Sequence, residues 1–213
     1  MLLKKYLELS FFLLRKAKLK ALIFPLCVYF VLPLITFFYY KKYGIGDELN
    51  DGVLMFSQTL IPIFSVLNFS FVICNHIEGN GKELFRLYCP SSVVLLLISF
   101  VGTAFTLLPF FVVCKIVIAY PLTEYLHMLF ETGLMFILFF TVSELLTSVS
   151  GGVVFSTAYG VISYMFPKYF WSFYSRHMMT GETALKKYIP LLSAAVVLCV
   201  VLLLPKRIKR KYI

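Results

Sequence analysis

Three ionisable residues, Glu124, His127 and Glu131, follow one another at spacings of three and four within an otherwise apolar stretch. In an α-helix this spacing places all three side chains in one narrow stripe. Ionisable groups inside a membrane are costly, so they mark transport paths, metal ligands or proton relays. The structural alternative is that Glu124 is solvated near the outer interface and that Glu131 pairs with Lys115 on another helix.

Other chemical motifs are missing from the sequence. His76 and His177 are expected on opposite sides of the membrane, so a three-histidine zinc site cannot form within one subunit. The sequence contains no serine-nucleophile motif, no paired-glutamate motif and no GxxxxGK[ST] phosphate loop. Five cysteines lack metal-binding spacing and are interpreted as small apolar residues: Cys27, Cys74, Cys89, Cys114 and Cys199. We therefore predict no catalytic, metal or cofactor-binding residues in this chain.

A polar segment at residues 76–90 separates two long apolar runs. Glycines just after Glu78 loosen the backbone where a membrane helix ends. Glu83 and Arg86 then lie on one side of a short predicted helix, whose other side is apolar. Pro90 begins the next helix at low cost, because the missing N–H would be unpaired there. A short amphipathic helix between two spans is suited to receiving force from a soluble partner.

The composition is that of an integral membrane protein. Of the 213 residues, 61% are hydrophobic and only 14% are charged, which is more apolar surface than a soluble core of this size could bury. Spanning helices need roughly 20 apolar residues. The apolar runs are continuous rather than alternating, as a membrane β-barrel would require. The fold class is therefore all-α, a polytopic membrane protein.

Six transmembrane helices are predicted in a single transmembrane domain, residues 1–213, at residues 21–40, 53–74, 91–119, 124–146, 153–166 and 188–204. Residues 1–20 are amphipathic and basic, so they are expected to form an interfacial helix. A signal peptide is the alternative, but basic residues rather than small ones follow its apolar part. The fifth run is too short to cross alone, and the aromatic segment 167–187 is expected to form short outer-leaflet helices.

Local signals refine the expected helix ends. Pro25 and Pro33 should kink the first span, and Gly102 and Pro109 should interrupt the third. Residues 41–52 and 120–123 are expected as outer connections, and residues 148–152 as a tight cytoplasmic turn.

Charge predicts the orientation. The net charge is +10, and basic residues gather before the first span and after the last. The positive-inside rule then places both termini in the cytoplasm of what we expect to be a bacterial plasma membrane. Membrane lipid, rather than nucleic acid, is the expected contact of these residues.

This arrangement resembles the permease subunits of type-2 ATP-binding-cassette exporters. The local likeness lies in an acidic residue, a glycine, a glutamate-containing helix and a proline that starts the third span; Glu83 stands about one position earlier than in the family. The resemblance implies that residues 78–88 are a coupling helix that docks on an ATPase. It assigns coupling to Glu78, Gly81, Glu83, Phe85, Arg86, Leu87 and Pro90.

The resemblance also implies a function. The chain would move an amphipathic or hydrophobic substrate, such as a peptide, lipid or drug, while ATP and Mg²⁺ bind a separate ATPase subunit present in two copies. The permease would be a homodimer or pair with a second permease. Polar residues expected along the path are Gln58, Asn68, Glu124, His127 and Glu131. The alternatives are a non-transporting scaffold or sensor, and an intramembrane metal or proton-relay enzyme.

Overall fold

The computed structural model describes residues 8, 22–78, 92–166, 172, 174, 186–197 and 200. The predicted interfacial helix at 1–20, most of the coupling segment and of the outer segment 167–187, and the end of the last predicted span lie outside the described residues.

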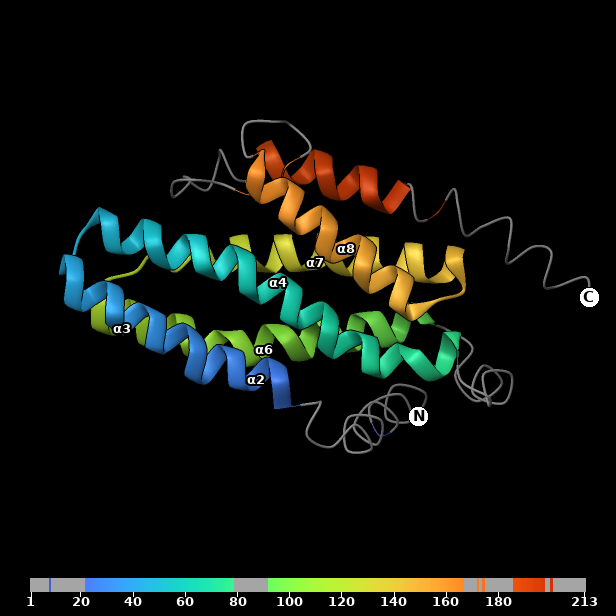
Figure 1. The fold of residues 1–213 in the computed structure, drawn as a ribbon, viewed down its shortest axis with the longest axis horizontal. Coiled ribbons are helices and arrows are strands. Elements are labelled where there is room, and N and C mark those ends of the chain that lie inside the picture. Colours follow the sequence, from blue (N-terminus) through green and yellow to red (C-terminus); the bar gives the residue numbers. More distant parts are fainter. Residues whose placement is uncertain are drawn as a thin grey trace, which may run out of the picture.

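All regular structure in the described part of the chain is helical. The elements are α2 (Ile23–Leu26), the π-helix η2 (Cys27–Val31), α3 (Leu32–Tyr43), α4 (Asp47–Ile77), α6 (Ser92–Ile118), α7 (Thr123–Leu146) and α8 (Val149–Met165); residues 186–197 are also helical. The long helices run lengthwise through the molecule, and α8 and residues 186–197 lie on one side of them (Figure 1).

Within the described residues, four helices are long and apolar enough to cross a membrane: Ile23–Tyr43, Asp47–Cys74, Val93–Ile118 and Thr123–Leu146. The prediction of an all-helical chain with several membrane-length helices is therefore confirmed. Helix α8 has 17 residues and rises only about 26 Å, which agrees with the expected short fifth run. The six-span topology stays a prediction.

The first of these helices is irregular between its two prolines. Pro25 lies in α2 and Pro33 in the first turn of α3, and the π-helical turn η2 separates α2 from α3. Because Pro33 has no N–H, the backbone bond that it would donate cannot form, and the chain accommodates this by widening one turn.

The predicted outer loop at 41–52 is wrong in extent, because only residues 44–46 are non-helical. Gly44, with φ of 72°, ends α3 in the left-handed region. Asp47 and Glu48 form the first turn of α4, where carboxylates interact favourably with the free N–H groups and the helix dipole. The charged residues Asp47 and Glu48, which were interpreted as part of a loop, therefore lie in the first turn of a helix.

The expected interruption of the third span at Gly102 and Pro109 is also wrong, since α6 is continuous. Hydroxyl groups supply donors to carbonyls in this region: Thr106 Oγ1 donates to the Gly102 carbonyl at 2.9 Å, and Tyr29 Oη donates to the Thr106 carbonyl at 2.8 Å. Because no water reaches backbone groups inside a bilayer, the chain keeps its remaining helical bonds through Gly102 and Pro109.

The predicted turn at 148–152 is shorter than expected. Thr147 is left-handed, with φ of 52°, and Ser148 is the extended N-cap of α8, accepting from the Gly151 N–H at 3.2 Å. Gly152 therefore lies inside α8, where a Cβ would come within 2.9 Å of the Phe139 carbonyl oxygen. Glycine here permits close packing of α8 on α7.

Helices α4 and α7 form the centre of the bundle. In each, 56% of the most apolar 18-residue window is buried, compared with 22% in the first candidate span and in α6. One buried apolar cluster joins the end of α4 to α7, and a second joins its beginning to η2 and α6. Polar residues on α4 and α7 are therefore held in the interior.

Candidate functional site

The stripe on α7 is buried. Glu124 and Glu131 are 0% exposed and His127 is 3% exposed. His127 Nδ1 lies 2.7 Å from Glu124 Oε2, one turn earlier on the same helix. The expectation that Glu124 is solvated is wrong, because the bundle covers it although it lies in the first turn of α7.

Glu131 is held by residues from two other elements. Tyr188, in the 186–197 helix, donates its hydroxyl to Glu131 Oε1 at 2.7 Å. Gln58, on α4, lies close to this carboxyl group. The expected pairing of Glu131 with Lys115 is wrong, since the Lys115 side chain is exposed. Lys187 is a nearby cation, and its Nζ donates to the Tyr174 carbonyl at 2.6 Å.

Several buried polar atoms of this region have no hydrogen-bond partner among the described residues: Glu124 Oε1, His127 Nε2, Glu131 Oε2, Thr132 Oγ1 and Tyr120 Oη. Leaving such an atom unsatisfied costs about 1–3 kcal/mol. The cluster can therefore accept polar groups from water or from a substrate. Glu124 and His127 are also close enough to exchange a proton.

Tyr120, in the connection between α6 and α7, is buried near Glu124. Burial raises the pKa of the Tyr120 phenol well above its usual range, and the neighbouring charge of Glu124 adds to the effect. The hydroxyl therefore keeps its proton and stays a hydrogen-bond donor.

The structure brings together four of the five predicted path residues and separates the fifth. Gln58 lies near Glu131. It also lines a small cavity of about 10 Å³, with Thr59 and Tyr164, and this cavity has room for about one water molecule. Asn68 is half-buried on α4, ten residues beyond Gln58, and so lies roughly 15 Å further along the axis.

The described residues contain no group of three or more His, Cys, Asp and Glu residues that could hold a metal.

A second arrangement lies at the opposite end of α4. Glu78 is the C-cap of α4, and its Oε1 accepts from the backbone N–H of Val149, the first residue of α8. A carboxylate at a helix N-terminus interacts favourably with the helix dipole. Of the predicted coupling residues, only Glu78 is described; Gly81, Glu83, Phe85, Arg86, Leu87 and Pro90 lie outside the described residues.

Helix α4 also meets α7 at this end, where His76 Nε2 lies 3.9 Å from Glu144 Oε1. Both side chains are buried. Sequence reasoning missed this pair, and it missed the contact of Glu78 with Val149. One signal for the second contact was available. The first N–H groups of any helix that begins after Ser148 have no partner within that helix, so they need an acceptor from elsewhere.

No protein-family model matches the chain, and the searches found no similar curated protein and no similar solved structure.

Proposed function

We propose that the chain is the membrane-spanning subunit of an ATP-driven exporter of the type-2 ATP-binding-cassette class, moving an amphipathic or hydrophobic substrate and coupled to a separate ATPase. Six spans with both termini in the cytoplasm, and pairing with a second permease, belong to this proposal. The observation that carries it is the bond between Glu78 and the Val149 N–H. It ties the start of the polar connection between α4 and α6 to the start of α8.

This bond supports a route by which force could enter the bundle. In the proposal, an ATPase moves residues 79–90 as it closes on ATP. Glu78 passes the movement to α8, and the close contact at Gly152 passes it from α8 to α7. Helix α4 carries Glu78 directly. One input therefore reaches both central helices, as a rigid-body rocking mechanism requires.

The same two helices carry the polar cluster. Gln58 lies on α4, and Glu124, His127 and Glu131 lie on α7. When rocking separates α4 from α7, the buried carboxyl and imidazole groups line the opening. The unpaired atoms Glu124 Oε1 and Glu131 Oε2 can then accept from polar groups of an amphipathic substrate, whose apolar part contacts the surrounding aromatic side chains.

The test is co-purification from gently solubilised membranes, followed by mass spectrometry and an ATPase assay. We expect a stoichiometric ATPase to accompany the chain, and Glu83→Ala with Arg86→Ala to release it. Glu48→Ala with Lys42→Ala, at the other end of the bundle, removes the same charges and should leave the complex intact. Purification without a nucleotide-binding partner would overturn the proposal and favour a scaffold or sensor.

The contact between Glu124 and His127 favours a second candidate, an intramembrane proton-relay enzyme. Its test is His127→Ala. In such an enzyme this substitution abolishes turnover, whereas in a transporter it changes substrate preference and leaves ATPase binding unchanged.

A further inference from the structure

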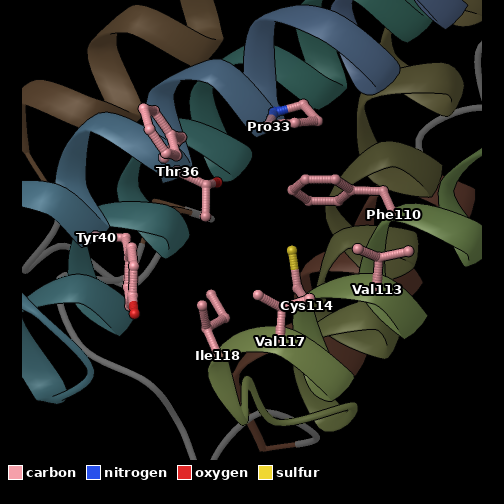
Figure 2. A pocket seen from close by; sticks show the side chains of 9 residues that line it. Pro33, Thr36, Tyr40, Phe110, Val113, Cys114, Val117 and Ile118 are labelled. Atoms are coloured by element: carbon pink, nitrogen blue, oxygen red, sulfur yellow. The ribbon is translucent and has the colours of Figure 1, made fainter.

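An apolar groove lies between α3 and α6, away from the polar cluster. Its volume is about 190 Å³, and it is open on one side. Figure 2 shows Thr36 and Tyr40 from α3 facing Val113, Cys114 and Val117 from α6 across this space. Almost all of the surface that it presents is apolar.

The groove arises because the first candidate span approaches α6 and then leaves it. At η2 the span packs on α6, where Tyr29 Oη donates to the Thr106 carbonyl. After Pro33, α3 packs mainly on α4 instead, with the Tyr39 ring 5.5 Å from the Phe56 ring. The π-helical turn and Pro33 lie at this divergence and account for the change in direction.

The groove has a buried floor and exposed walls. Phe110, Cys114 and Ile118 form the floor and belong to the apolar core. Of the wall residues, Phe37 is 58% exposed and Val113 is 57% exposed. Both helices are candidate membrane spans, so these walls face hydrocarbon. An apolar space of this size excludes water and takes up an apolar guest, and in a bilayer that guest is an acyl chain.

Two lysines, Lys41 and Lys115, lie in the last turns of the two helices that form the groove. Lys41 follows the lining residue Tyr40, and Lys115 follows the lining residue Cys114. Both are exposed, and neither has an ion-pair or hydrogen-bond partner within the described ranges. Lysine side chains near helix ends extend to the membrane interface while their methylene groups stay on the apolar surface. Their ammonium groups are therefore placed to meet a phosphate.

We propose that the groove binds an anionic phospholipid, with one acyl chain between α3 and α6 and the phosphate between Lys41 and Lys115. The site does not depend on the exporter function.

The test uses the purified full chain in nanodiscs that contain a phospholipid with a photoreactive acyl chain. With phosphatidylglycerol, we expect labelling to concentrate on peptides from α3 and α6. Phosphatidylcholine should label them roughly tenfold less, because it carries no net charge for the two lysines. Lys41→Ala with Lys115→Ala should abolish this difference.

Matched variants separate the groove from the general lipid surface. Val113→Trp fills the groove and should remove the labelling; Val112→Trp, on the neighbouring lipid-facing position outside the groove, should leave it unchanged. Val117→Trp provides a second filling variant should the first unfold in detergent. Equal labelling of the Val112 and Val113 variants, or equal labelling by the two lipids, would overturn the proposal.

Discussion

Removing the Glu78 carboxylate should release the start of α8. In Glu78→Ala the Val149 N–H loses its acceptor, and helix α8 loses a negative charge at its N-terminus. Capping bonds contribute about 0.5–2 kcal/mol. Because the Glu78 side chain is exposed, solvent screening favours the lower half of that range. We therefore expect local opening to become easier by about 1 kcal/mol.

Hydrogen exchange measures this effect where it occurs. A change of about 1 kcal/mol corresponds to roughly fivefold faster exchange at the first amides of α8. Glu78→Gln keeps an acceptor oxygen and loses only the charge, so its exchange should rise less. Asp47→Ala removes a carboxylate from the first turn of α4 and serves as the control, since it should leave α8 unchanged. Unaltered exchange at the start of α8 in Glu78→Ala would refute the reasoning.

Three substitutions test the packing and the polar cluster. Gly152→Ala places a Cβ within 2.9 Å of the Phe139 carbonyl oxygen and should destabilise the protein by about 1–3 kcal/mol in thermal unfolding. Gly102→Ala is its control, because the added Cβ meets nothing within 4 Å and should be neutral or slightly stabilising. Tyr188→Phe removes the donor to Glu131 and should cost about 1–3 kcal/mol; an unchanged unfolding temperature would show that this bond does not form in the bilayer.

The helices could be predicted from the sequence because continuous apolar runs of membrane length have few other structures open to them. Their ends were predicted less well. Charged residues such as Asp47 indicate a loop on composition alone, yet a helix N-terminus is also where a carboxylate is favourable. Gly152 posed the same difficulty, since a glycine that permits close helix packing has the same local pattern as one that forms a turn.

The polar cluster could be predicted only along one helix. The spacing of Glu124, His127 and Glu131 places them on one stripe whatever the tertiary structure. Their partners come from packing between helices far apart in the sequence, which local periodicity does not encode. The partner of Glu131 is therefore Tyr188 rather than the expected Lys115. The contact of Glu78 with α8 likewise joins residues that are 71 positions apart in the sequence.

Site-specific photocrosslinking tests the exporter proposal most directly. A photoreactive phenylalanine analogue replaces Phe85 in the predicted coupling segment, and the same analogue replaces Leu122 in the connection between α6 and α7 as a control. We predict that position 85 crosslinks in membranes to a protein that carries a nucleotide phosphate-binding loop, and that position 122 does not. Crosslinks from position 85 only to lipid, or to a protein without such a loop, would contradict the proposal.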